Sequence, residues 1–455
     1  MPHLEGLRIE HFRGFLEPQE FSFATPNEVP GSGLTILVGP NNVGKSTVVE
    51  ALRTVVTPPQ FIDRRERHVD KAVRISIKDS THNKKEITNP GLGATITTQG
   101  NAFPTQSQLR YVPSRRPWAS RASPQRIDLA GYWTNRSIQS RTEDTLLIGR
   151  ISAFPPEEKV AFEKILSELA PQIRSWNIEY SDGHAYLEYT TLNGSQHNAD
   201  LFGDGIASLF RIALALYDPI FDVFVVIDEP ELSLHPQAQK RLADFISRSA
   251  AHRQILVCTH SPYFVNWGDL ATGTLVYRLR QTRDGIKAAR LSSEAIEGLR
   301  RLFEDWEKPQ LLDPVAREVF FADEVVFFEG QEDIGLIRRF TEQEGITPIQ
   351  TFGYGVGGAG NIKIFLKMAA DLNIPAFAVF DGSSKREYDD AKNLFPNIRM
   401  EQLPTEDIRD KPATPNRKAR DGLFNNNGSI KKHHRQFLID LIAEIRSHLD
   451  ECAAP

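Results

Sequence analysis

The sequence predicts an α/β protein built in two parts, on the evidence of where apolar strands and helical patterns alternate. A fully apolar run, Leu34 to Gly39, precedes a glycine-containing loop and a helical pattern, as expected for a buried parallel strand and the helix after it. The alternation returns over residues 222–262 and again over residues 324–381. At roughly 100 to 200 residues per domain, 455 residues suffice for two. We expect one domain over 1–309 and a smaller one over 310–455.

The composition is that of a globular protein and excludes several other classes. Hydrophobic residues make up 40% and charged residues 25%, and no apolar run approaches the roughly 18 to 20 residues that a membrane span requires. The first residues carry charges where a secretory signal is apolar, and two cysteines allow at most one disulfide. We therefore expect a cytoplasmic protein with no membrane partner. The net charge of −5 gives no general attraction to nucleic acid, so such a contact would need a local basic patch.

The remaining segments are assigned from their patterns in chain order. The first forty residues alternate as strands do, and residues 61–109 are rich in charges and turn formers, which is typical of exposed hairpins. Residues 156–172 have helical spacing behind a proline and two glutamates. In the second part we expect three strands: one that ends at Glu329, one within residues 346–355, and one that ends at Asp381. Helices near 332–344 and 361–372 should separate them. A mobile loop over 411–428 and a C-terminal amphipathic helix over 435–449 complete the prediction.

The segment from Arg110 to Arg150 is locally basic. It holds eight arginines and three acids, with Tyr111, Trp118, Tyr132 and Trp133 interleaved. Such a segment can contact nucleic-acid phosphates and stack bases, or it can form a subunit interface in which arginines pair with acids. We treat residues 110–172 as a short insert that serves either in dimerisation or in DNA contact.

The strongest motif is a phosphate-binding loop. GPNNVGKS, Gly39 to Ser46, matches GxxxxGK[ST] between a buried strand and a helix, which is the context that the motif requires. Its backbone N–H groups can cradle phosphates, Lys45 can reach the β and γ oxygens of ATP, and the Ser46 hydroxyl can help hold Mg²⁺. The residues assigned to the nucleotide are Gly39, Asn41, Asn42, Gly44, Lys45, Ser46 and Thr47.

Two later motifs complete an ATPase site. VFVVIDEP places Asp228 and Glu229 at the C-terminal end of an apolar strand, where Asp228 can bind Mg²⁺ and Glu229 can polarise the attacking water. ELSLHP and the later THSP, residues 259–262, resemble the ABC-type ATPases, in which the histidine after the next strand contacts the γ-phosphate; the resemblance assigns that role to His260. The alternative is a histidine that only caps a strand end.

The same resemblance implies an ATP sandwich between two protomers, closed by a glycine motif at the start of a helix. FGDGIASLFRIALAL resembles that signature, with Gly203, Asp204 and Gly205 leading into an apolar-periodic helix. An ordinary glycine cap on a core helix is the alternative.

The second part carries acids at the ends of its predicted strands. EVVFFEGQED places Glu329 at a strand end and Asp333 four residues later, and PAFAVFDG ends the next strand in Asp381. Carboxylates at the ends of neighbouring parallel strands can converge on a divalent cation. The pattern is similar to the Toprim fold, which uses Mg²⁺ or Mn²⁺ to cleave DNA strands. The glycine-rich stretch over 352–365 also fits that fold.

The order of an ABC-type ATPase followed by a Toprim-like domain resembles the OLD (overcoming lysogenization defect) family of ATP-dependent nucleases. The resemblance is carried by residues 34–50, 222–262 and 316–382 and is weak over 60–200. It implies Mg²⁺-dependent cleavage of DNA, a homodimer or higher homo-oligomer, and a role in defence against phage.

One position departs from the family pattern. Where a second aspartate is expected after Asp381, the chain has Ser383, which can ligate a metal but adds no negative charge. Glu406 is the compensating ligand that we select, with Asp389, Asp390 and Asp407 as alternatives. Lys431, or Lys432 beside it, is assigned to stabilise the phosphate in the transition state, unless this stretch is a solvated loop.

The sequence thus favours an ATP-dependent DNA endonuclease. The main alternative is an ATP-gated DNA-binding sensor of the repair type whose Toprim-like domain is degenerate and docks or activates a partner effector; Ser383 favours it. A transporter subunit is a third alternative, for which the second domain has no evident role.

Overall fold

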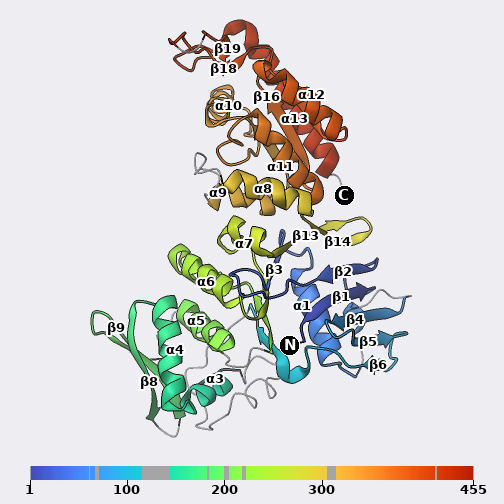
Figure 1. The fold of residues 1–455 in the computed structure, drawn as a ribbon, viewed down its shortest axis with the longest axis vertical. Coiled ribbons are helices and arrows are strands. Elements are labelled where there is room, and N and C mark those ends of the chain that lie inside the picture. Colours follow the sequence, from blue (N-terminus) through green and yellow to red (C-terminus); the bar gives the residue numbers. More distant parts are fainter. Residues whose placement is uncertain are drawn as a thin grey trace. The chain divides into compact units, whose positions relative to one another are not determined.

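The chain folds into two units, each with its own sheet and helices (Figure 1). One unit contains Met1–Val265 and Thr272–Ala288, and the other contains Asn266–Ala271 and Ala289–Pro455. The computed structural model describes residues 2–60, 62–66, 71–114, 143–181, 184–198, 204–217, 222–304, 314–415 and 418–453.

The break between the units falls at 288/289, ahead of the 309/310 boundary that the sequence suggested. Helix α8 (Ser293–Glu304) packs against helix α11 (Ala359–Asp371) of the second unit and therefore groups with it. The Ser292 hydroxyl and backbone N–H both donate to the Asp371 carboxylate, at 2.5 and 2.9 Å, which attaches the start of α8 to the end of α11.

The first unit opens with an antiparallel sheet, as the alternating pattern and the hairpin prediction indicated. Its strand order is β2-β1-β4-β5-β6, and helix α1 (Lys45–Val56) packs on β1, β4 and β5. Alternate residues of β4 are buried against α1, so one face of the sheet supplies part of the core and the other meets solvent. The strands are β1 (Leu4–Glu10), β2 (Gln19–Ser22), β4 (Val73–Asp79), β5 (Lys84–Asn89) and β6 (Thr97–Gly100).

A six-stranded sheet forms the centre of the first unit, in the order β14-β13-β3-β12-β11-β7. The four pairings from β13 to β7 are parallel, and every residue of β3, β11 and β12 is buried, which explains why these strands read as unbroken apolar runs. The strands are β3 (Leu34–Val38), β7 (Leu109–Val112), β11 (Phe224–Asp228), β12 (Gln254–Cys258), β13 (Leu275–Thr282) and β14 (Gly285–Arg290).

The predicted insert over 110–172 begins later than expected. Residues Arg110 to Val112 belong to β7 and pair with β11, so the first part of the basic segment lies in the central sheet. The side chains of Arg110 and Arg150 are buried: Arg110 donates to the Ser107 carbonyl, and Arg150 pairs with Glu158. These two arginines are therefore structural. Residues 115–142, including Trp118, Tyr132 and Trp133, lie outside the described residues.

A helical layer and a small antiparallel sheet complete the first unit. The ring of Phe162 lies 5.8 to 6.0 Å from the rings of Trp176, Phe210 and Tyr217, and this cluster joins α4 and α5 to the sheet β10-β9-β8. The elements are α3 (Glu143–Ser152), α4 (Pro156–Leu169), α5 (Asp204–Tyr217), α6 (Pro236–Ser249), β8 (Ile173–Ser181), β9 (His184–Thr191) and β10 (Gln196–Asn198).

The second unit is built on a parallel sheet with the order β15-β16-β17. Residues 346–355 do not form the predicted strand; Thr351 makes only an isolated bridge to Val326. The predicted loop over 411–428 contains a strand that pairs with β18. The elements are α7 (Trp267–Thr272), α9 (Pro314–Arg317), β15 (Val325–Phe328), α10 (Gln331–Glu344), β16 (Ala376–Phe380), α12 (Lys385–Leu394), β17 (Arg399–Gln402), β18 (Asp407–Arg409), β19 (Gly422–Phe424) and α13 (Arg435–Ala453).

Two expectations from composition can be compared with the described residues. None of the helices in that part of the chain has the length and apolar character needed to cross a membrane. Cys258 is a buried residue of β12 and Cys452 is exposed on α13, and neither forms a disulfide.

The assignment of α8 to the second unit predicts where a core mutation will be felt. Leu299 is 2% exposed, and Leu299→Ala should lower the free energy of opening of α8 and α11 by about 2 to 5 kcal/mol. Hydrogen exchange should therefore increase in α11 and stay unchanged in β3 and β12. Arg301→Ala, at an exposed position of the same helix, is the control and should change exchange little. Faster exchange in β12 with none in α11 would contradict the assignment.

Candidate functional site

The phosphate-binding loop connects β3 to α1 and needs glycine at both of its ends. Gly39 has φ of 139°, and a Cβ atom there would lie 2.5 Å from the carbonyl oxygen of Leu279. Gly44 caps α1 with φ of 95°. The Lys45 ammonium donates to the carbonyl oxygens of Gly39 and Pro40, each at 2.8 Å, and its burial lowers the pKa of Lys45. Asn41 and Asn42 are exposed at the tip of the loop.

The acids predicted to serve ATP lie beside this loop. Asp228 ends β11 and is 3% exposed, and its Oδ2 atom lies 3.5 Å from the Ser46 hydroxyl oxygen. Glu229 follows with φ of 49°, and its Oε1 atom is 4.0 Å from His260 Nε2. Burial, followed by the charge of Lys45, lowers the pKa of His260. The structure thus brings together Ser46, Asp228, Glu229 and His260; Thr47 lies in the first turn of α1.

Glu231 was not among the predicted site residues, yet it holds His260 in place. Its Oε2 atom accepts from the Thr259 hydroxyl at 2.9 Å, and its Oε1 atom accepts from the His260 backbone N–H at 2.5 Å. Burial raises the pKa of Glu231. The carboxyl therefore ties the loop after β11 to the loop after β12. The motif ELSLHP contained the signal, but the sequence alone does not show which backbone N–H its glutamate would meet.

The predicted signature lies at the start of α5. An added Cβ at Gly205 would lie 2.4 Å from the carbonyl oxygen of Ser233, so this helix start packs closely on the segment that follows Glu231. Asp204 is the first residue of α5, and Gly203 lies outside the described residues. A cavity of about 400 Å³ adjoins this contact and is lined in part by Gly205, Ser233 and His235.

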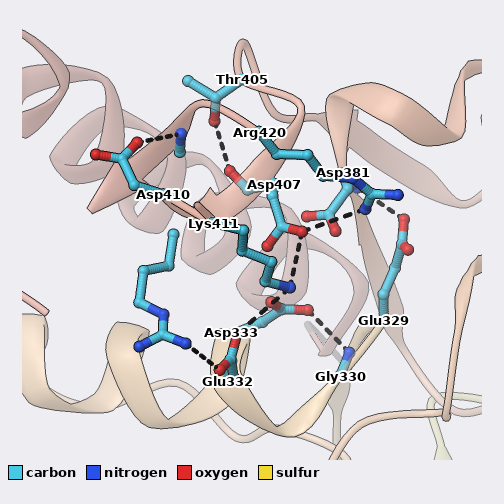
Figure 2. A network of polar contacts seen from close by, with 12 residues as sticks. Glu329, Gly330, Glu332, Asp333, Asp381, Thr405, Asp407, Asp410, Lys411 and Arg420 are labelled. Carbon is cyan, nitrogen blue, oxygen red and sulfur yellow. Dashed lines mark hydrogen bonds and ion pairs between the residues drawn. The ribbon is translucent and has the colours of Figure 1, made fainter. Parts of the chain in front are cut away.

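In the second unit, four acids form a carboxylate cluster consisting of Glu329, Asp333, Asp381 and Asp407 (Figure 2). Glu329 and Asp381 directly follow β15 and β16, Asp333 lies in the first turn of α10, and Asp407 begins β18. Glu329 Oε1 accepts from the Asp381 backbone N–H, and Asp333 Oδ2 accepts from the Gly330 backbone N–H, both at 2.8 Å. Two backbone donors thus orient two of the carboxylates.

Burial and mutual repulsion disfavour the charged forms of these acids. Burial, with repulsion from Glu329 and Asp407, raises the pKa of Asp333 to about 7. Burial, with repulsion from Asp333, Glu329 and Asp407, raises the pKa of Asp381 to about 8. Burial also raises the pKa of Glu329, against hydrogen bonds from the Asp381 N–H and the Ser384 hydroxyl. Burial and repulsion therefore outweigh the effect of nearby positive charge on Asp333 and Asp381.

Two cations already contact one member of the cluster. Asp407 is 2% exposed, and its Oδ2 atom lies 2.8 Å from Lys411 Nζ and 3.4 Å from Arg420 Nη1. Lys411 Nζ is also 3.4 Å from Glu332 Oε2, and Arg409 pairs with Glu332 at 2.6 Å. Figure 2 shows the Lys411 ammonium between Asp407 and Glu332.

The structure does not bring three of the softer assignments into the carboxylate cluster. Glu406 is exposed, because residues alternate at the start of β18 and Asp407 takes the inward position. Ser383 is exposed, whereas Ser384 is buried and hydrogen-bonded to Glu329. Lys431 pairs with Asp410 and Asp421, each at 2.6 Å, outside the carboxylate cluster.

The donor set of the cluster suits a hard divalent cation. Among the described residues, no three His, Cys, Asp or Glu side chains already stand at metal-binding spacing. Glu329 and Asp333 each accept a backbone N–H, which orients the carboxylates without neutralising their charge, so both can still bind a metal. Oxygen ligands are those that Mg²⁺ and Mn²⁺ prefer. Because the carboxylates repel one another, a cation would draw Glu329, Asp333 and Asp381 together.

Comparison with known proteins confirms the resemblance that the motifs indicated. Models of AAA domains match residues 6–128 and 192–266, the latter with a description that also mentions the AbiEii toxin of a type IV TA system. The TOPRIM domain of overcoming lysogenization defect protein-like proteins matches residues 320–382. A curated OLD nuclease of Thermus scotoductus is 23% identical over 434 residues, covering 80% of this chain and 81% of that protein. The fold is a P-loop ATPase followed by a TOPRIM domain, as predicted, and the chain is an ATPase.

Head domains of SMC proteins are among the similar solved structures. The SMC head domain from Thermotoga maritima is 15% identical with a TM-score of 0.39, covering 64% of this chain and 99% of that one. The Smc head domain from Pyrococcus furiosus, bound to the C-terminal domain of ScpA, is 13% identical with a TM-score of 0.45, covering 67% of this chain and 99% of that one.

The raised pKa values predict a pH dependence of stability in the absence of divalent metal. Asp333 and Asp381 stay protonated in the folded unit up to about pH 7 and 8, whereas unfolded aspartate ionises near pH 4. Folding therefore takes up protons in this window, and the stability present below about pH 4 is lost as the pH rises through 7 to 8. Asp381→Asn, which cannot ionise, should lose less.

Thermal midpoints in EDTA at about pH 5, 7 and 9 measure the effect. Asp389→Asn, at an exposed position of α12, is the control and should follow the wild-type profile. An Asp381→Asn protein that loses stability as steeply as the wild type would contradict the interpretation.

Proposed function

We propose that this chain, which resembles an OLD nuclease in sequence and in the order of its domains, is an ATP-dependent DNA endonuclease. The proposal rests on one observation above the others: Glu329, Asp333 and Asp381 gather at the C-terminal edge of a parallel sheet, in a chain that also has a P-loop site beside Asp228 and Glu229. The first arrangement suits a metal that acts on phosphodiesters, and the second suits ATP hydrolysis.

In the ATPase unit, each residue has a role that follows from its position. Lys45 leaves the carbonyl oxygens of the loop to bind the β and γ phosphate oxygens, while Ser46 and Asp228 hold the Mg²⁺ that accompanies ATP. Glu229 polarises the attacking water, and His260, held by Glu231, contacts the γ-phosphate.

In the TOPRIM unit, Glu329, Asp333 and Asp381 hold a divalent cation, Mg²⁺ or Mn²⁺. The cation would neutralise a DNA phosphate and lower the pKa of a bound water. Gly330 and the Asp381 backbone N–H fix the direction of the carboxylates toward the metal. Lys411 and Arg420, rather than Lys431, supply the positive charge beside these acids.

We also propose that ATP joins two copies of the chain and that this dimer controls cleavage. The start of α5 packs against the segment after Glu231, and Glu231 holds the backbone of His260. A γ-phosphate held by the partner that contacts Gly205 would therefore act on the loop that carries Glu229 and on the loop that carries His260. A role in anti-phage defence rests on the family resemblance alone.

A second candidate is the ATP-gated DNA-binding sensor with a degenerate TOPRIM domain. The observation that favours it is the neutralisation of Asp407 by Lys411 and Arg420, together with the exposed and uncharged Ser383. In that case the second unit would bind DNA or a partner without cutting.

ATP hydrolysis tests the first half of the proposal. Glu229→Gln should lower ATP turnover by about 10² to 10⁴-fold, because the water loses its general base, while ATP binding is retained. Glu157→Gln, at an exposed position of α4, is the matched control and should hydrolyse ATP at the wild-type rate. Turnover unchanged in Glu229→Gln would remove Glu229 from the reaction.

Cleavage of supercoiled plasmid with Mg²⁺ or Mn²⁺, with and without ATP, tests the second half. Glu329→Ala should reduce nicking at least about 100-fold and leave ATP turnover intact, because it removes a metal ligand. Glu406→Ala removes an exposed carboxylate close by in sequence to the cluster and should cut normally. Cleavage that persists in pure Glu329→Ala protein would refute the assigned site. An intact ATPase that cuts under no condition would favour the sensor.

A further inference from the structure

We infer that the carboxylate cluster takes one divalent cation rather than two, and that Lys411 with Arg420 occupies the place of a second. The inference rests on the proposed function and concerns the composition of the same site. Three observations support it: Lys411 and Arg420 both contact Asp407, the backbone places these two residues side by side, and the acids and bases around the cluster carry a small net charge.

Asp407 is the member of the cluster whose negative charge is already compensated. Its carboxylate is 2% exposed, and a buried carboxylate needs a partner. Lys411 and Arg420 both contact the same oxygen, Oδ2, at 2.8 and 3.4 Å. This oxygen is therefore unavailable to a metal unless both cations withdraw.

The backbone places Lys411 and Arg420 side by side at this position. Lys411 and Arg420 form a bridge in which each backbone N–H donates to the carbonyl oxygen of the other, at 3.0 and 2.9 Å. The bridge follows directly on the pairing of β18 with β19, so both residues project from ordered structure beside Asp407. Lys411 also reaches Glu332 and thus joins two carboxylates, as a bridging cation does.

The charges of the network leave room for one divalent ion. Five acids and three bases carry a net formal charge of −2 when all are ionised, which one Mg²⁺ or Mn²⁺ neutralises and two would reverse. The acids are Glu329, Glu332, Asp333, Asp381 and Asp407, and the bases are Arg409, Lys411 and Arg420.

The position of Ser383 leads to the same conclusion. A second metal needs an additional anionic ligand, and the residue two positions after Asp381 is an exposed serine. The serine at 383 and the lysine at 411 each make the site less negative, and therefore each weakens the binding of a second divalent cation.

Counting bound Mn²⁺ tests this inference directly. The full chain is titrated with Mn²⁺ without nucleotide, in an Asp228→Asn background that removes the metal ligand of the ATP site, and free Mn²⁺ is followed by electron paramagnetic resonance. We expect one Mn²⁺ per chain. Asp381→Asn should weaken its binding more than about tenfold, and Asp407→Asn should change it less than about threefold, because only the former removes a ligand.

The double variant Lys411→Gln with Arg420→Gln should bind a second Mn²⁺, because Asp407 is then free. Lys363→Gln is the matched control, since it breaks the Lys363–Asp390 pair elsewhere in the same unit, and it should still bind one. Hydrogen exchange of β18 and β19 reports whether each variant is folded.

The outcomes separate the inference from the proposal on which it rests. Two Mn²⁺ bound by the chain with native Lys411, or equal losses in Asp407→Asn and Asp381→Asn, would overturn the inference and leave the nuclease proposal standing. A single Mn²⁺ in the folded double variant would also overturn it. No Mn²⁺ binding before either basic residue is changed would overturn both.

Discussion

Both sites depend on one constraint of parallel sheets, which is that all strands end at the same edge. In the first unit this edge brings the phosphate loop after β3 beside Asp228 after β11 and His260 after β12. In the second unit it brings Glu329 after β15 beside Asp381 after β16. Residues far apart in sequence meet there because the strands run in the same direction and their buried apolar side chains set the register.

The two edges differ in how charge is balanced. At the ATPase edge, Lys45 lies buried near Asp228, Glu229 and Glu231, and its charge offsets part of theirs. At the TOPRIM edge, Lys411 and Arg420 pair with Asp407, and Lys411 also pairs with Glu332, yet the pKa values of Asp333 and Asp381 are raised. Burial and repulsion between carboxylates therefore outweigh the nearby positive charge at the second site.

The predicted site residues that the structure brings together lie in short contiguous motifs. In GPNNVGKS, a strand, a loop and a helix follow within a few residues, so local geometry sets the direction of Lys45 and Ser46. Sequence patterns are insufficient where the position of a side chain depends on a one-residue shift of register or on pairing with a distant segment. Glu406 and Asp407 point to opposite sides of one chain segment. Lys411 reaches the acids through a bridge to Arg420 that no local pattern reveals, and Arg110 interrupts the apolar signal of β7.

Glu231 has a consequence beyond the placement of His260. Its carboxyl accepts hydrogen bonds from the Thr259 hydroxyl and the His260 backbone N–H. Two residues earlier in the same loop, the backbone N–H of Glu229 donates to the Cys258 carbonyl. The two loops are thus joined at two points and behave as one mechanical element. A change of residue 231 would leave the Thr259 hydroxyl and the His260 N–H without this acceptor, so we expect residues 231 and 259 to vary together.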